Sequence, residues 1–264
     1  MDVFSVMTSR AMDVLKTLSK EPKTRKELSR ELGLSPSSLS QIIRKLENFG
    51  CIGEVEGVWT LELKGKLVLK MYEAVSRYES LFDSVDLNEY YVEDIPEHLI
   101  DRFFELSGVR VVNAFDRTIF KPHMLVIRDI LESEKVSGYS AMLYPEYAEV
   151  FIKIAEKGVE VEAIVSEAVF TKVKQEFSED LQKFLSFDNV TLLVADNYAF
   201  SSILTTKSFF MSFFFKNRTL DYTRFYAWND RDGLRWGNEL FEYIRENSYE
   251  VRLDDSKDVE IAEI

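Results

Sequence analysis

Apolar residues recur at helical spacing near the start of the chain and predict two short helices there. Four apolar side chains within residues 10–18 follow the spacing of one buried helical face. A second helix is predicted to begin at the sequence Thr-Arg-Lys-Glu of residues 24–27, because a threonine and a glutamate three positions apart form a capping box. The glycine at position 33 favours the left-handed turn that ends a helix.

A third helix is predicted to begin at Ser35 and Pro36, since serine favours the N-cap and proline the first helical position. We expect it to end before Gly50, so that two helices flank a short turn with the spacing of a helix-turn-helix. Two short β-rich runs around Gly57 predict a hairpin, and residues 63–72 return to a helical pattern. Three helices followed by a hairpin are typical of a winged helix.

The two faces of the third helix differ in chemistry. Leu39, Ile42, Ile43 and Leu46 share one face, whereas the opposite face is polar and free of acids. Arginine and glutamine suit the edges of guanine and adenine, and serine and lysine suit phosphates. The sequence therefore predicts contact with double-stranded DNA through this helix and the start of the second. The candidate DNA-binding residues are Thr24, Arg25, Lys26, Ser37, Ser38, Gln41, Arg44, Lys45 and Asn48.

After a helical pattern over residues 73–85, strand and helix patterns alternate. Strands are predicted at 109–112, 136–139, 159–165 and 189–194, and helices at 122–132, 145–157 and 166–177. Such alternation indicates βαβ units and a parallel sheet covered on both faces. Strands between tight polar turns at 201–206, 209–215 and 220–226 then predict antiparallel pairing, before a last helix at 230–247 capped by Asn229. We expect the aromatic run 209–215 to be a buried central strand rather than the lining of a pocket.

These patterns predict an α+β winged helix-turn-helix head joined by a helical connector to an α/β body with a mixed sheet. We expect the DNA-binding head over residues 1–72, the connector over 73–88, an effector and dimerisation body over 89–250 and a patternless acidic tail over 251–264. One face of the connector carries Val75, Tyr78, Leu81 and Phe82. This stripe suits either a dimer seam or packing against the body.

Charge is divided unevenly between these parts. The 264 residues include 33 Lys and Arg against 46 Asp and Glu, for a net charge of −13. Residues 1–75 hold 12 basic against 10 acidic side chains, which leaves −15 for the rest. Only the head can therefore approach a polyanion without repulsion. Glu54 and Glu56 argue against the hairpin tip as the main phosphate contact.

Composition disfavours several other classes of protein. A single cysteine excludes a disulfide framework, and one Cys with two His cannot form a Cys₄ or Cys₂His₂ zinc site, so we expect no metal. No glycine-rich phosphate loop of the G-x-x-x-x-G-K type occurs, and we expect no cofactor. No apolar run approaches the roughly 18 residues of a membrane helix. The first residues lack the basic flank and apolar run of a signal peptide. We therefore expect a cytoplasmic protein without a membrane partner.

The last part of the chain resembles a known family. The strings Phe-Phe-Lys-Asn at 214–217 and Leu-Arg-Trp-Gly-Asn-Glu-Leu-Phe-Glu-Tyr at 234–243, with Asp221 and Ser248, resemble the archaeal winged-helix regulators of methanogens, whose middle domain is named for methanogenesis and filament regulation. Residues 144–147 and 157–161 resemble the same domain. Where that family commonly has Asp-Gly, this chain has Asn-Arg at 217–218, which affects the turn type. The resemblance implies a transcriptional regulator and transfers no catalytic residue.

Few groups are candidates for catalysis. The order of strands also resembles a phospholipase D-like half-domain, but covalent phosphoryl transfer there needs a histidine two positions before a lysine, and Lys207 follows Thr205. His98 and His123 lie at predicted helix starts. Cys51 has no basic neighbour to lower its pKa, so we expect a small buried hydrophobe. We assign no catalytic residue.

An effector in the body is expected beyond the carboxyl ends of the parallel strands. The candidate effector-binding residues there are Asn113, Ser140, Tyr144 and Ser166. The sequence thus predicts a homodimeric transcriptional regulator that reads a pseudo-palindromic operator and responds to a small-molecule effector or a partner. Two alternatives stay open: a winged-helix protein-interaction module without DNA binding, and a degenerate phospholipase D-like phosphodiesterase.

Overall fold

The structure, a computed structural model, describes residues 2–113, 121–143, 145–253 and 259–261. The chain divides into two compact units, Met1–Glu79 and Ser80–Ile264, here called the N-terminal unit and the C-terminal unit. The helix α4 (Leu63–Ser84) spans this division. No helix among the described residues is long and apolar enough to cross a membrane.

Three helices form the first part of the N-terminal unit: α1 (Ser9–Lys20), α2 (Arg25–Leu32) and α3 (Pro36–Phe49). Each begins after a residue whose side chain accepts a hydrogen bond from a backbone N–H of the first turn, which satisfies one of the free donors there. These N-caps are Thr8, Thr24 and Ser35. The predicted capping box at the start of α2 is confirmed.

A three-stranded antiparallel sheet completes the predicted winged helix. Its strands β1 (Lys23–Thr24), β2 (Ile52–Val55) and β3 (Val58–Leu61) lie in the order β1-β3-β2. Glu56 and Gly57 link β2 to β3 with φ angles of 52° and 82°. Two left-handed residues in a row give the turn whose twist matches that of the flanking strands.

The faces of α3 are divided as the sequence predicts. Leu39, Ile43 and Leu46 are buried in one cluster with Leu15 of α1 and Trp59 of β3. The neighbouring Ile42 packs partly buried against that cluster. Burial of these apolar side chains fixes α3 on the unit and leaves its polar face outward.

Apolar side chains lie exposed along one side of α4. Leu63 is 71% exposed, and Leu67, Met71 and Val75 are about half exposed. The predicted stripe on this helix is only partly right. Leu81 is buried in the C-terminal unit, whereas its neighbour Phe82 is 60% exposed.

The C-terminal unit contains a mixed sheet, which confirms the predicted fold class. The strand order in the described residues is β12-β11-β7-β6-β5-β8-β9-β10-β4. Among these described strands the pairs β5–β6 and β6–β7 are parallel, and the other neighbours are antiparallel. The strands are β4 (Arg110–Asn113), β5 (Lys135–Ser140), β6 (Glu160–Ser166), β7 (Val190–Ala195), β8 (Phe200–Thr205), β9 (Phe209–Phe213), β10 (Arg224–Trp228), β11 (Tyr249–Leu253) and β12 (Val259–Ile261).

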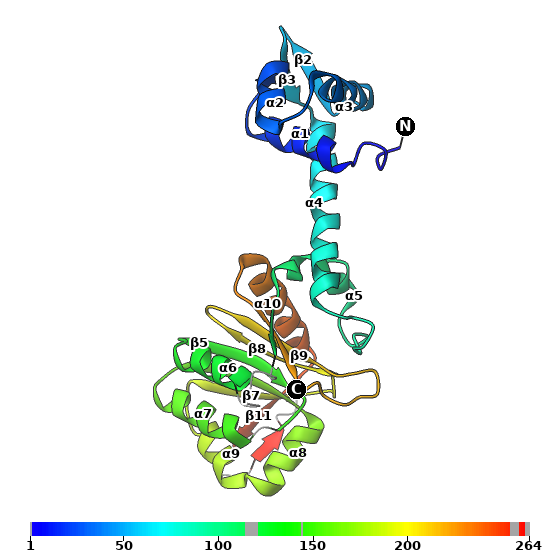
Figure 1. The fold of residues 1–264 in the computed structure, drawn as a ribbon. Coiled ribbons are helices and arrows are strands. Elements are labelled where there is room, and N and C mark those ends of the chain that lie inside the picture. The colour runs from blue at the N-terminus through cyan, green and yellow to red at the C-terminus, as the bar shows by residue number, and fades with distance from the viewer. Residues whose placement is uncertain (1, 114–120, 144, 254–258, 262–264) are drawn as a thin grey trace. The chain divides into compact units, whose positions relative to one another are not determined.

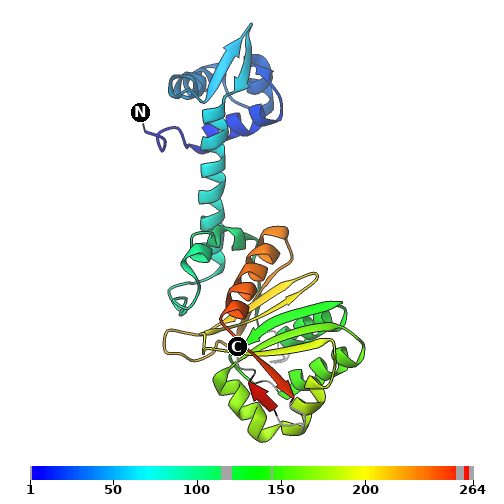
Figure 2. The same cartoon turned by 180° about the vertical axis from the view of Figure 1, so that it is seen from behind.

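Helices cover both faces of this sheet (Figures 1 and 2). One face carries α6 (Lys121–Leu131), α7 (Pro145–Glu156), α8 (Glu167–Glu176) and α9 (Ser178–Leu185), and the other carries α10 (Arg231–Glu246). The short helices α5 (Glu97–Ile100) and η1 (Phe103–Gly108) precede β4, and η1 contacts α10. Successive side chains of β9 point to opposite faces of the sheet. Phe210 packs into the apolar cluster with α6 and α7, whereas Phe209 stacks on Trp228.

Several predicted limits are wrong. The last predicted strand begins at Arg224 rather than at residue 220, because residues 214 and 220 form only an isolated bridge. Asp230, not Asn229, caps α10, since its carboxylate accepts hydrogen bonds from the backbone N–H groups of residues 232 and 233. The tail expected over 251–264 contains the end of β11 and all of β12, whose apolar residues pair at the sheet edge. Helix α9, which begins just after Phe177, has no counterpart among the predicted elements.

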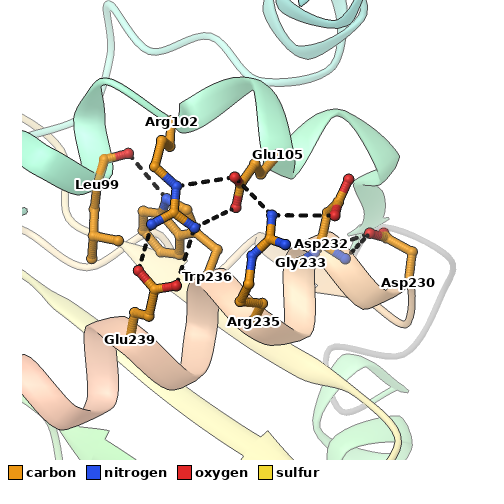
Figure 3. Close-up of polar contacts among 9 residues, drawn as sticks. All are labelled: Leu99, Arg102, Glu105, Asp230, Asp232, Gly233, Arg235, Trp236 and Glu239. Carbon is orange, nitrogen blue, oxygen red and sulfur yellow. Dashed lines mark hydrogen bonds and ion pairs between the residues drawn. The ribbon is translucent and has the colours of Figure 1, made fainter.

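A cluster of charged side chains links η1 to α10 (Figure 3). Arg102 contacts both Glu105 and Glu239, with nitrogen to oxygen distances of 2.8 Å and 2.5 Å. Arg235 lies 2.8 Å from the Glu105 carboxylate on its other side. Burial alone would raise the pKa of Glu105, but the hydrogen bonds from these two arginines outweigh it and hold the pKa below its ordinary value.

We expect Glu105→Gln to lower the free energy of unfolding of the C-terminal unit by about 1–3 kcal/mol at pH 7, since both guanidiniums lose a buried carboxylate. A lowered pKa in the folded state makes this contribution fully present above the unfolded value of about 4.3 and lost as the pH falls through the folded value. The difference from the original chain, measured by urea unfolding, should therefore shrink below about pH 4. The exposed Glu134→Gln is the control, and a loss of equal size there would contradict the assignment.

Candidate nucleic-acid interface

The polar face of α3 is open to solvent. Ser37, Gln41, Arg44, Lys45 and Asn48 are exposed, and Ser38 is half-buried. The acids of α3 are limited to Glu47, which lies outside this set. The face therefore presents hydrogen-bonding and positively charged groups only, as direct readout of base edges and phosphates requires.

The turn before α3 is fixed by short-range hydrogen bonds. Gly33 ends α2 in the left-handed region with φ of 63°. The Leu34 N–H donates to the carbonyl oxygen of Ser29, and the Ser29 hydroxyl donates back to the carbonyl oxygen of Leu34. These contacts hold α2 and α3 in the helix-turn-helix arrangement.

The structure separates the predicted residues at the start of α2 by what their side chains already contact. The Thr24 hydroxyl accepts from the Glu27 N–H as an N-cap, so it is occupied. The Arg25 guanidinium lies 5.3 Å from the ring centre of Trp59. Lys26 is exposed and forms no hydrogen bond, ion pair or ring contact with the residues that the structure describes. Lys26 is thus the freest cation of this group.

A hollow in the surface beside α3 includes a residue that the sequence analysis missed. Thr8, the N-cap of α1, lines this hollow with Gln41, Arg44, Lys45 and Asn48. The Lys45 ammonium donates to the carbonyl oxygen of Ser5 at 3.3 Å, which brings the segment before α1 next to the polar face. Thr8 comes next to the polar face of α3 only through the packing of α1 on α3. The sequence alone indicates at most an N-cap at Thr8.

The candidate effector residues do not form one group. Ser140 and Ser166 end the adjacent strands β5 and β6, but the Ser166 hydroxyl is buried as the N-cap of α8. Asn113 is in β4 at the far edge of the sheet, separated from β5 by three strands, because β4 pairs antiparallel with β10. Tyr144 lies outside the described residues. Of the three candidates that the structure describes, Ser140 alone lines a cavity, which lies between the sheet and helices α7, α8 and α9.

Residues weighed for other chemistry have ordinary surroundings. Cys51 is fully buried in the core of the N-terminal unit, and burial raises the pKa of its thiol. The Lys207 ammonium lies 3.3 Å from a carboxylate oxygen of Glu132. The described residues contain no group of three or more His, Cys, Asp or Glu side chains that could hold a metal ion.

Two family models match the chain. The bacterial regulatory protein arsR family matches residues 8–52, the segment from the N-cap of α1 to the first residue of β2. The middle domain of the methanogenesis regulatory protein FilR1 matches residues 119–247, which extend through α10. No curated protein sequence matches the chain.

Solved structures show more distant similarity. TrmBL2, described as an archaeal chromatin protein, has 13% sequence identity and a TM-score of 0.42, with 92% of this chain and 94% of that chain covered. ZitR of Lactococcus lactis, described as a zinc-responsive MarR family member, has 23% identity and a TM-score of 0.24 over 38% of this chain and 73% of its own. The phosphatidylserine synthase of Haemophilus influenzae Rd KW20 has 10% identity and a TM-score of 0.40, covering 82% and 54%. With such low TM-scores these three carry no argument about function.

The family matches agree with the geometry of both units. The arsR-type match covers the helix-turn-helix whose outer face is polar and free of acids, and the FilR1 match includes the Trp-Gly string that first indicated that domain. The chain is thus a DNA-binding transcriptional regulator that combines an arsR-type helix-turn-helix with a region similar to the FilR1 middle domain.

Proposed function

We propose that the chain binds DNA as a homodimer in which each α3 enters one major groove. Ser37, Gln41 and Arg44 would read base edges, and Lys26, Ser38 and Lys45 would hold phosphates. The observation that carries the proposal is the exposed, acid-free face of α3. A two-fold dimer would set the two helices about 34 Å apart, on one side of a pseudo-palindromic operator.

The second copy is proposed to pack along α4. Four apolar side chains recur every four residues along this helix, and each is between 47% and 71% exposed. They are Leu63, Leu67, Met71 and Val75. Exposed apolar patches of this kind mark protein interfaces, because their burial against a like surface removes apolar area from water. The C-terminal unit would then change the spacing of the two α3 helices when an effector binds.

A binding titration tests the DNA-binding proposal. Full-length protein is titrated onto duplex from upstream of its own coding sequence and onto random duplex of equal length, at several salt concentrations. We expect specific binding at least about a thousandfold tighter than random binding. The logarithm of affinity should fall steeply with the logarithm of salt, by about 0.9 per phosphate contact. Absence of salt-dependent binding to any duplex would favour the protein-interaction alternative.

The dimer seam is tested by charge substitution on α4. Leu67→Lys should raise the dimer dissociation constant at least about tenfold, because both copies would place an ammonium in an apolar seam. Ser80→Lys adds the same charge at an exposed position on another side of the helix and is the control. Sedimentation velocity measures both. An unchanged dimer in Leu67→Lys would exclude this seam and leave the DNA proposal intact.

A further inference from the structure

An apolar cavity of about 180 Å³ lies within the C-terminal unit, between the sheet and the helices α7, α8 and α9. These helices cover one face of the sheet in Figure 1. Half-buried aromatic side chains border the cavity, so it reaches toward the surface. The aromatic side chains that line it from the helices and their junction are Tyr147, Phe151, Phe170, Phe177 and Phe184.

Small residues on the sheet create this space. Gly138 of β5 pairs with Ala163 of β6 on one side and with Ile203 of β8 on the other. A Cβ at Gly138 would lie 2.6 Å from the Ser202 carbonyl oxygen, so only glycine allows β8 to approach β5 this closely. Gly138 and Ala163 have little or no side chain, so this part of the sheet surface lies farther from the helices than its surroundings. The large side chains of the helices do not fill the space that remains between helices and sheet.

Four serines are among the described lining residues, Ser202 included, and three of them lie opposite one another on adjacent strands. Ser140 of β5, Ser201 of β8 and Ser212 of β9 all line it, and Ser201 pairs directly with Ser212. The Ser140 hydroxyl donates to the Met142 carbonyl oxygen, and the Ser201 hydroxyl accepts from the Ala141 N–H.

The Ser212 hydroxyl is different. Ser212 is 2% exposed, and its hydroxyl forms no hydrogen bond with any residue in the described part of the chain. The Ser212 hydroxyl oxygen is not among the fully buried polar atoms that lack a partner in the described residues, so it is open to the cavity rather than sealed in the core. A hydrogen-bonding atom of a bound molecule would satisfy it.

The charge of the walls defines the ligand further. Among the lining residues that the structure describes there is no Lys, Arg or His, and the one carboxylate among them, that of Asp180, is exposed at the border. An anion would therefore find no cation, and a buried cation would find no carboxylate, so the cavity favours a neutral molecule. Its volume slightly exceeds the roughly 150 Å³ of an apolar cavity that holds benzene.

We propose that this cavity binds a neutral, mainly apolar molecule about the size of one substituted six-membered ring, whose single hydroxyl or carbonyl oxygen meets Ser212 and Ser201. This inference rests on the proposed function only for the ligand's role as effector, because binding itself needs no DNA. The ligand would hold α8 and α9 against the sheet.

The test uses two probes of the same ring, fluorobenzene and 4-fluorophenol, titrated onto the full-length protein and followed by fluorine NMR. Both should bind saturably, and 4-fluorophenol should bind about three to ten times tighter, as one hydrogen bond allows. Ser212→Ala should abolish that preference and leave fluorobenzene binding unchanged. Ser137→Ala, which removes a buried hydroxyl of β5 outside the cavity, should change neither.

A second variant fills the space. Ala163→Leu should weaken binding of both probes at least tenfold, while far-ultraviolet circular dichroism reports whether the fold is kept. If that variant fails to fold, the comparison of Ser212→Ala with the original chain still decides the question. The proposal is overturned if neither probe binds saturably below about 1 mM, where ligands of this size should already bind. An undiminished preference for 4-fluorophenol in Ser212→Ala would also overturn it.

The DNA titration with and without 4-fluorophenol separates this inference from the proposed function. A change of at least threefold in DNA affinity supports the effector role. Probe binding with unchanged DNA affinity would overturn that role. Probe binding by a protein that binds no DNA would instead contradict the proposed function and leave the cavity as a ligand site.

Discussion

Arg44→Ala should weaken specific DNA binding by about 1–3 kcal/mol, roughly a factor of ten to a hundred, and should relax specificity at one base pair. Arg44 is exposed on the acid-free face of α3 and lines the hollow next to Gln41 and Asn48. A guanidinium there can donate two hydrogen bonds to a guanine edge, which no single uncharged side chain replaces. Titration against an operator library with each position varied measures both effects.

The matched control for this substitution is Arg128→Ala. Arg128 is a 64% exposed arginine of α6 in the C-terminal unit, so the variant loses the same charge away from α3. Affinity for both specific and random duplex should be unchanged there. An equal loss on specific and random duplex in Arg44→Ala would leave Arg44 a phosphate contact and would contradict its base-reading role.

The N-terminal unit could be predicted closely because its signals are local. The capping box of Thr24 and Glu27 and the left-handed Gly33 each involve residues within a few positions of one another. Their geometry is therefore set by the backbone itself. The contact of Thr8 with the polar face of α3 was missed, since it depends on how two helices pack rather than on either sequence.

The C-terminal unit was predicted in its elements and in the parallel pairing of its βαβ part, but not in its full strand order. Alternation of strands and helices indicated that β5, β6 and β7 pair in parallel, which is confirmed, yet it contains no information on where the later strands join the sheet. β8 pairs with β5, and β11 returns to pair with β7. The cavity was out of reach for the same reason, because Ser140, Ser201 and Ser212 come from three strands that only the strand order brings together.

The Trp-Gly string that indicated the FilR1 domain has a structural explanation. Trp236 is fully buried, and its indole N–H donates to the Leu99 carbonyl oxygen at 3.0 Å (Figure 3). A Cβ at Gly237 would lie 2.4 Å from the Phe209 ring, so α10 can approach β9 only with glycine there. The Trp-Gly string thus packs α10 against the sheet and hydrogen-bonds it to α5. These residues are required for the fold rather than for a reaction.

Trp236→Ala should therefore lower the free energy of unfolding of the C-terminal unit by about 3–5 kcal/mol, as expected for removal of a buried indole. The loss combines the cavity left next to Phe103 and Phe209 with the lost indole hydrogen bond to the Leu99 carbonyl oxygen, which keeps the Arg102 N–H as a donor. Urea unfolding of the full chain, with hydrogen exchange of α10 peptides, measures it.

Tyr249→Ala is the control for lost aromatic area, because Tyr249 is 51% exposed on β11 and should cost less than about 1 kcal/mol. Trp236→Phe keeps a ring but loses the hydrogen bond, so its cost should fall between the two. Exchange in α3 should be unchanged in all three variants, since α3 belongs to the other compact unit. Equal costs for Trp236→Ala and Tyr249→Ala would mean that the family string marks something other than the seat of α10, and a ligand or partner contact would have to be sought there.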